Sequence, residues 1–288
     1  MNVFEEVFQT AKKTNEVRIE EAGSEASSEQ FDLNKWKEEQ QTIRNDVYGF
    51  LEEITSALQA GEVEMNRYLD IQTRFIDYSP SNALLILAQN SEAKKLGTAE
   101  FWKDSRAQLK VDAEHIYILE KGTAYQKQDG SIAANYVPRK MFDISQTNIK
   151  PNTKKPDYSR RSLLSGLVKD CSYCITVQNE LSLPVIVGES EIYYRKDIEF
   201  EEGFSWLSYV ISALSMDQSN KVLLDYKARC AAYILCTKLG IPFQMESEWN
   251  DGNPLLHFKN PKAYRQQLKE IRNTAFQLYH NILSVIDR

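Results

Sequence analysis

The stretch that decides the fold is YSPSNALLILAQNSEAKKLGTAEFW, residues 78–102. Ser79 followed by Pro80 is a typical helix start, because serine caps the first free N–H groups and proline tolerates the first helical position. The segment 83–88 is apolar on every side, which predicts a helix buried near the centre of the protein. Gly97 then predicts a turn before a second, shorter helix.

Amphipathic helices are predicted before this stretch, and strands are predicted after it. HIYILE (115–120) and the segment 136–144 have the composition of β-strands, and Asp129-Gly130 predicts a hairpin turn between strands. Pro138 indicates an edge strand or a bulge. Residues 31–150 are therefore expected to form an α+β unit, a helical layer followed by a small antiparallel sheet.

Three regions are expected along the chain. Residues 1–30 read as a flexible or helical tail with seven acidic and three basic side chains. The segment 148–158, NIKPNTKKPDY, is rich in proline and lysine and predicts a domain boundary. Residues 151–288 are expected to form a second α+β domain, with short strands followed by long helices near 199–216, 221–239 and 261–286.

The amino-acid composition and net charge narrow the classes of protein to which this chain can belong. The chain has 288 residues, 42% apolar and 26% charged, as in ordinary globular proteins. Its net charge of −6 argues against coating of nucleic acid through bulk charge. No apolar run reaches the ~18 residues of a membrane span, and the first residues lack the apolar segment of a secretory signal. We therefore expect a cytoplasmic protein with no membrane partner.

The segment from Tyr78 to Thr147 resembles the N-terminal domain of ArdC-type antirestriction proteins and of LtrC-like proteins of conjugative elements. The residues that carry the resemblance are the stretch 78–102 and KMFDISQT at 140–147. The shared pattern is an aromatic-Ser-x-x-Asn start, a buried LLILAQ helix, a Gly and a Trp, a hairpin and a closing FDISQT. The resemblance implies a domain that binds single-stranded DNA. The family's Lys/Gly-rich turn is replaced here by LKVDAEH (109–115), which contains two acidic residues and no glycine.

Binding of single strands without sequence preference needs cations for phosphates and aromatic faces for bases. Each aromatic candidate could pack in the core instead, and the acidic balance of residues 31–150 argues against strong binding. The basic run between Arg139 and Arg161 is either a phosphate-contacting strip or a solvated linker. The candidate DNA-binding residues are Arg67, Arg74, Tyr78, Asn82, Trp102, Lys103, Arg106, Tyr117, Lys121, Arg139 and Lys140, with Tyr68 and Tyr136 as further aromatic residues.

ArdC-type proteins continue into a zincin-like metallopeptidase domain, and two segments of this chain are similar to it: 188–214 and 225–241. Such a domain needs two histidines one helical turn apart and a glutamate that activates water. This chain has three histidines, and none lies four residues from another. In the alignment Glu201 and Ser205 take the positions of the two histidines, Glu202 that of the catalytic glutamate, and Arg229 that of an acidic ligand.

The resemblance therefore implies a degenerate domain, without zinc or other cofactor and without enzymatic activity. Arg229 is expected to contact Glu201 or Glu202 and to replace the charge of the ion, unless Arg229 is a plain surface residue. A four-cysteine zinc site is the remaining metal hypothesis, disfavoured because Cys230 and Cys236 lie in an apolar helix where cysteine behaves as a small hydrophobic residue. A hydrolase that uses Glu201 and Glu202 as paired carboxylates is also disfavoured, because adjacent helical residues point about 100° apart.

The sequence is compatible with two functions. The first is a single-stranded DNA-binding, antirestriction-like protein of a mobile or conjugative element, which protects or accompanies transferred DNA. The alternative is a protein-interaction module, a pseudoenzyme scaffold whose C-terminal cleft holds a protein partner and whose DNA binding is weak.

Overall fold

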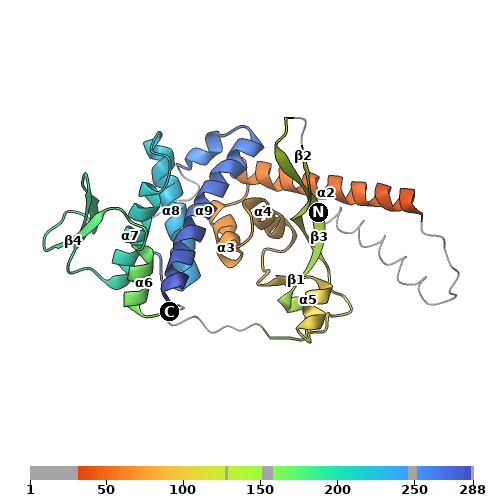
Figure 1. Ribbon diagram of the computed structural model, residues 1–288, viewed down its shortest axis with the longest axis horizontal. Coiled ribbons are helices and arrows are strands. Elements are labelled where there is room, and N and C mark those ends of the chain that lie inside the picture. The colour runs from red at the N-terminus through yellow and green to blue at the C-terminus, as the bar shows by residue number, and fades with distance from the viewer. Residues whose placement is uncertain (1–31, 127–128, 151–157, 246–251, 287–288) are drawn as a thin grey trace. The chain divides into compact units, whose positions relative to one another are not determined.

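The computed structural model describes residues 32–126, 129–150, 158–245 and 252–286 (Figure 1). The expected tail, residues 1–30, lies outside the described residues, as does most of the expected domain boundary. Residues 43–288 form one compact unit, and residues 1–42 are assigned to another. None of the helices in the described ranges is long and apolar enough to cross a membrane.

Three helices open the described chain: α2 (Leu33–Gln59), α3 (Met65–Arg74) and α4 (Pro80–Gln89). The Ser79 hydroxyl accepts a hydrogen bond from the Asn82 N–H at 3.3 Å, and Pro80 occupies the first turn of α4. The side chains from Ala83 to Leu87 are all buried. The prediction of a buried, serine-capped helix at the centre of this half is confirmed.

The first sheet is antiparallel, with strand order β1-β3-β2. It contains β1 (Leu96–Gly97), β2 (Ile116–Gln126) and β3 (Ile132–Asp143), and the short helix α5 (Ala99–Asp104) follows β1 beside it (Figure 1). Gly130 takes the positive φ of 80° that the hairpin turn requires. The strands are longer than predicted because their hydrogen-bonded ladder continues to residues such as Ile132, whose side chains are exposed.

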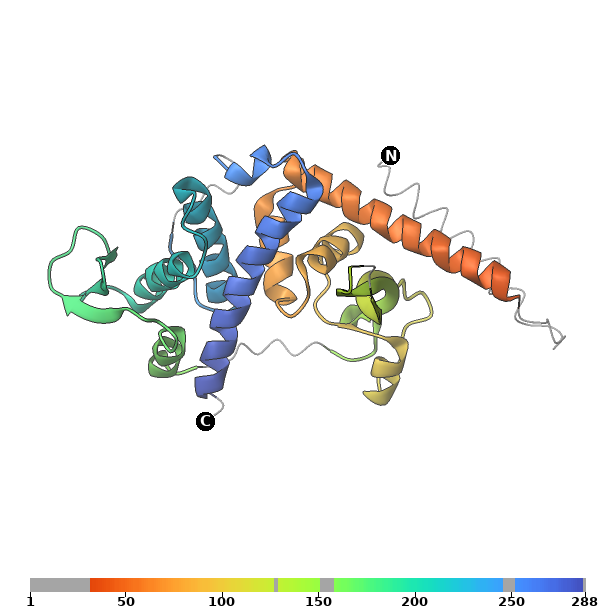
Figure 2. The same cartoon turned by 45° about the horizontal axis from the view of Figure 1, so that its top comes forward.

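The second half also mixes helices with a small sheet, so the α+β class is confirmed. Its sheet has the order β4-β6-β5, with β4 parallel and β5 antiparallel to β6. In Figure 2, α6 lies against the C-terminal part of α9, where Gly166 allows the two helices to approach closely. The elements are α6 (Arg160–Leu167), β4 (Cys174–Gln178), β5 (Val185–Val187), β6 (Glu191–Arg195), α7 (Phe200–Leu214), α8 (Lys221–Leu239) and α9 (Pro261–Ile286), with short 3-10 turns at Ile144–Gln146 and Pro254–His257.

The main hydrophobic core contains residues from both sides of the predicted boundary near residue 150. Ile71 and Leu84 of the first half belong to the same buried cluster as Ala228 and Ile271 of the second. A second cluster lies among α6, α7, β6 and the end of α9. The division at residue 150 stays a prediction.

Candidate functional site

Two side-chain amides of α4 bind the outer edge of β2. Asn82 donates to the Leu119 carbonyl at 3.0 Å and accepts from the Leu119 N–H at 2.8 Å. Gln89 bonds the backbone of Tyr117 in the same two-point way, at 2.9 and 2.8 Å. The helix thus satisfies the strand edge as a neighbouring strand would. Asn82 is buried and both of its polar atoms are used, so its predicted role as a DNA contact is replaced by a structural one.

The pairing register of the hairpin brings four predicted residues to one face of the sheet. Tyr117 lies opposite Lys140, and Lys121 lies opposite Tyr136. Opposite residues of an antiparallel pair point to the same side, and so do residues two apart along a strand. Tyr117, Lys121, Tyr136 and Lys140 therefore lie on one side of the sheet, which we call the Tyr–Lys face, and the Tyr117 ring there is partly buried against the main core. Tyr136 is 49% exposed, and the Lys140 ammonium lies 6.0 Å from the centre of the Tyr117 ring.

Arg139 projects from the opposite side of β3. Its neighbour on that side is Glu120, with 3.8 Å between the Arg139 Nε and a carboxylate oxygen of Glu120, and both side chains are about half exposed. A surface pair of this kind contributes little to stability. The structure therefore separates Arg139 from Lys140, although the two residues are adjacent in the sequence.

The Tyr–Lys face continues toward the end of β3 through His115 and Phe142. The His115 ring lies edge-on to Tyr117, with 4.7 Å between ring centres, and 6.5 Å from Phe142. Burial and the nearby Lys140 ammonium lower the pKa of His115 to about 4. His115 is therefore neutral at pH 7 and adds an aromatic ring, not a charge.

Trp102 lies in the core. It is 2% exposed, its indole N–H donates to the Phe142 carbonyl at 2.9 Å, and it packs with Ala107 and Ile144. Its predicted role as a base-stacking residue is therefore wrong, and the alternative of core packing holds. The exposed ring of this short helix belongs to Phe101, which is 41% exposed. Two signals in the sequence indicate that Phe101 could be the exposed ring. The helix begins after Thr98, and successive helical side chains point about 100° apart, so Phe101 and Trp102 face different sides.

The candidates on α3 and at its end serve mainly to hold the fold. The Arg74 guanidinium donates to the carbonyls of Ser91 and Ala93 at 2.6 and 2.7 Å, which ties α3 to the loop after α4. Tyr68 is fully buried, and Tyr78 packs edge-on against Phe75. Arg74 and Tyr78 are therefore both engaged in contacts within the fold.

The other three predicted cations, Arg67, Lys103 and Arg106, are exposed. Arg106 has a φ of 58°, which is unusual for a residue other than glycine. Lys154 and Lys155 of the predicted basic strip lie outside the described residues.

The residues aligned with a metallopeptidase site do not fit a metal ion. Glu201 pairs with Arg160 at 3.5 Å, and Glu202 pairs with Arg195 at 3.9 Å. The buried Ser205 hydroxyl donates to the Glu201 carbonyl at 2.7 Å and accepts from the Gln244 N–H at 3.2 Å. Each carboxylate thus faces a cation, and the hydroxyl is already engaged. Among the described residues no three His, Cys, Asp or Glu side chains converge as metal ligands would.

Arg229 makes a different contact from the one predicted. Its Nε lies 3.0 Å from Asp225, one helical turn earlier on α8, and its guanidinium lies 6.0 Å from the centre of the Tyr209 ring. The Tyr209 hydroxyl donates to the same Asp225 at 2.7 Å. The prediction of an Arg229 contact with Glu201 or Glu202 is wrong, because the i, i+4 partner on its own helix is nearer and α7 presents Tyr209 to it. Burial and Asp225 raise the pKa of Tyr209 to about 12.

Comparison with known proteins identifies the fold of this chain. No family profile and no curated protein matches the sequence. A crystal structure of the antirestriction protein ArdC from plasmid R388, with Mn(II) bound, matches with a TM-score of 0.53 and 12% identity, covering 88% of this chain and 98% of that one. The metal-free structure of the same protein matches with a TM-score of 0.47 and 11% identity, over 75% and 98%. The chain therefore has an ArdC-like fold.

Proposed function

We propose that this protein binds single-stranded DNA on the Tyr–Lys face. The observation that carries the proposal is the register of the β2–β3 hairpin, which places two tyrosines and two lysines on one side of the sheet. Tyrosine rings stack on bases whatever their sequence, and lysines attract the phosphates between them. The register was not visible in the sequence, although Tyr117, Lys121, Tyr136 and Lys140 were among the candidates.

The dimensions of the Tyr–Lys face suit a polynucleotide. Lys121 lies four positions after Tyr117 on β2, which is about 13 Å at the ordinary rise of a strand. A stacked strand of nucleic acid rises ~3.4 Å per nucleotide, so about four nucleotides can lie along the face. This length agrees with the site sizes of roughly 4–16 nucleotides found for single-strand-binding folds.

The fold and the motifs support a proposal for the biological setting. The neighbour in fold is named an antirestriction protein and comes from a plasmid. We infer that this chain is an antirestriction-like protein of a mobile or conjugative element, the setting of the ArdC-type and LtrC-like proteins that its motifs resemble. It would protect or accompany DNA that is transferred as a single strand. In this proposal the C-terminal half is metallopeptidase-like in fold and inactive, because Glu201 and Glu202 face arginines.

Fluorescence anisotropy with labelled single-stranded and double-stranded 30-mers over a salt series tests the proposal. We expect preference for the single strand and weaker binding as salt rises. Lys140→Gln should lower affinity and reduce the salt slope by about 0.7, because one phosphate contact is lost. Arg139→Gln is the matched control, since it removes a charge from the adjacent residue on the other face.

Two outcomes would contradict the proposal. Equal effects of the two variants would show that the bound strand does not use the Tyr–Lys face. No binding of the single-stranded 30-mer at low salt would leave the interaction module as the function. A specific observation favours that rival, because Val177, Leu183 and Val187 are all more than 40% exposed in and beside the β4-β6-β5 sheet.

A further inference from the structure

Phe101 is held as a fixed aromatic surface. A Cβ atom placed on Gly97 would lie 2.2 Å from the Phe101 ring, so the ring rests directly on the backbone of β1. Its other neighbour is Trp102, with ring centres 4.9 Å apart and planes at 73°. Thr98 caps the helix that carries both rings by accepting from the Phe101 N–H at 3.1 Å. An aromatic ring fixed in this way, yet 41% exposed, loses little freedom when a flat ligand stacks on it.

The sheet register places this ring on the same side as the Tyr–Lys face. Gly97 lies opposite Phe142 in the pairing of β1 with β3. Phe142 and Lys140 are two residues apart on β3, so both project to one side of the sheet. The direction in which a Gly97 Cβ would point is therefore the side of the Tyr–Lys face, and Phe101 covers that position.

A lysine accompanies the ring. The Lys95 ammonium lies 5.4 Å from the centre of the Phe101 ring and 5.9 Å from that of Trp102. The backbone of Lys95 is fixed, because its N–H donates to the buried Asp143 carboxylate at 2.9 Å. Glu100, one of two acidic residues of the same helix, has a pKa that is lowered by hydrogen bonds from its own backbone and from Thr98. A lysine ammonium also lies beside an aromatic ring at Lys140 and Tyr117, although the Tyr117 ring is partly buried.

We infer that Phe101 stacks on a base of a single-stranded polynucleotide and that Lys95 contacts an adjacent phosphate. This inference rests on the proposed function and extends its site across β1, from the hairpin to α5. Phe101 takes the role that the sequence assigned to Trp102. Neither Phe101 nor Lys95 belongs to the set of residues predicted from the sequence.

The test compares an oligothymidylate 30-mer with an abasic strand of the same number of phosphates. Wild-type protein should prefer the thymidylate strand. Phe101→Ala should lower affinity for the thymidylate strand about tenfold or more and leave affinity for the abasic strand unchanged, because only the stacked base is lost. Phe101→Leu should behave like Phe101→Ala, since it keeps an apolar side chain without an aromatic face, and Phe101→Trp should retain binding.

Lys95→Gln provides the second arm. It should weaken binding of both strands and reduce the salt slope by about 0.7, because a phosphate is present in each strand. Thermal melts of every variant show whether the fold is retained, and Val222→Ala, a change at an exposed apolar residue of α8, serves as the control.

The outcomes separate this inference from the proposed function. If Phe101→Ala and Phe101→Leu bind thymidylate as tightly as wild type while Lys140→Gln binds more weakly, the stacking role is refuted and the proposed function stands. Equal losses on the thymidylate and abasic strands would also refute stacking. If wild-type protein binds neither strand, both proposals fail.

Discussion

Asp143 shows how much of the N-terminal half depends on one side chain. Its carboxylate is buried and accepts hydrogen bonds from the N–H groups of Lys94, Lys95 and Ser145, at 2.6, 2.9 and 2.9 Å. Its own N–H donates to Gln146 at 2.9 Å. Burial alone would raise the pKa of Asp143, but the hydrogen bonds outweigh burial and hold the pKa below its usual value. The carboxylate therefore joins the end of β3 to the entry of β1.

Asp143→Asn should lower the free energy of unfolding by about 2 kcal/mol at pH 7, because the amide NH₂ would face an N–H donor. The native pKa lies below the unfolded value of ~3.9, so this stability is present above ~3.9 and is lost as pH falls through the native pKa. Urea unfolding at pH 7 and in acid measures the difference between wild type and variant, which should shrink in acid. Asp112→Asn, at an exposed position, is the control and should change stability by less than ~0.5 kcal/mol.

At the scale of elements, side-chain amides of α4 form hydrogen bonds with the backbone at the edge strand β2. Asn82 and Gln89 lie two turns apart on α4, and their partners Leu119 and Tyr117 lie two residues apart on β2. A strand edge left open would carry unpaired N–H and C=O groups. Here those groups are occupied by side chains, which closes the edge of the sheet to further strands at this point.

Asn82→Ala should lower the free energy of unfolding by about 2–3 kcal/mol, because it leaves two backbone groups of the buried Leu119 without partners. Asn135→Ala, an exposed position on β3, should change it by less than ~0.5 kcal/mol. Chemical denaturation measures both. Equal stability of the two variants would show that water replaces the amide and that the contact is dispensable.

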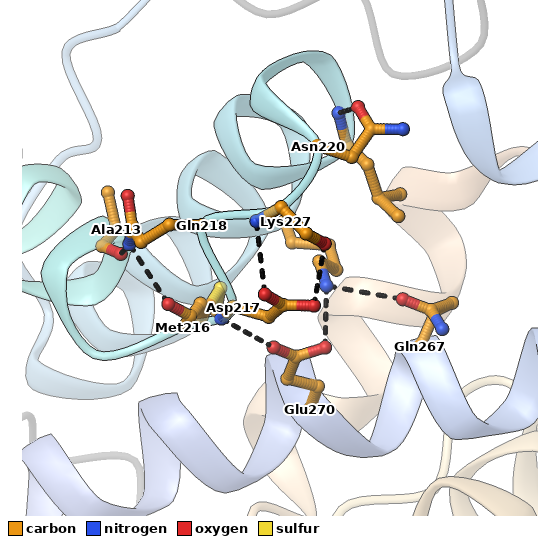
Figure 3. A network of polar contacts seen from close by, with 10 residues as sticks. Ala213, Met216, Asp217, Gln218, Asn220, Lys227, Gln267 and Glu270 are labelled. Atoms are coloured by element: carbon orange, nitrogen blue, oxygen red, sulfur yellow. Dashed lines mark hydrogen bonds and ion pairs between the residues drawn. The ribbon is translucent and has the colours of Figure 1, made fainter.

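At the scale of the molecule, hydrogen bonds and the core join the two halves. Arg272 of α9 donates to the carbonyls of Ile76 and Asp77, at 2.8 and 2.9 Å. Figure 3 shows a contact within the second half, in which the buried Lys227 of α8 reaches Glu270 and Gln267 of α9. A buried ammonium is costly unless it is paired, so Lys227 fixes the position of α8 along α9.

We expect one cooperative unfolding transition for residues on both sides of position 150, because they share the main core. Fluorescence of a variant that keeps only Trp102 and of one that keeps only Trp206 reports on the two halves separately. The two denaturation midpoints should coincide. Clearly separated midpoints would support independent domains that meet near residue 150.

The melting temperature should not depend on bound metal. The Glu201 and Glu202 carboxylates face Arg160 and Arg195, and Arg229 faces Asp225, so the charge balance around α7 and α8 is supplied by arginines. Excess chelator should therefore leave the melting temperature unchanged, and elemental analysis of purified protein should find less than stoichiometric zinc and manganese. One metal ion per chain, together with a fall in melting temperature on chelation, would overturn this expectation.

Local features were accessible from the sequence alone. The cap at Ser79 and the hairpin turn at Gly130 occur where their residue types predicted them, and Thr98 and Gly240 occupy cap positions that threonine and glycine favour. Each of these signals depends on hydrogen bonds or backbone angles within about four residues, so the sequence contains all of the groups involved. The helices, most strands and the α+β class follow from such signals together with apolar periodicity.

Only the tertiary structure decided which side chains the candidate site contains. Trp102 and Phe101 are adjacent and both apolar, yet only Trp102 is buried, where it packs with and donates to Phe142, forty residues away. Asn82 is paired with Leu119 across 37 positions, and the hairpin register separates Lys140 from Arg139. Burial and hydrogen bonding between distant residues depend on how elements pack, and the local pattern of one segment does not contain the partner against which it packs.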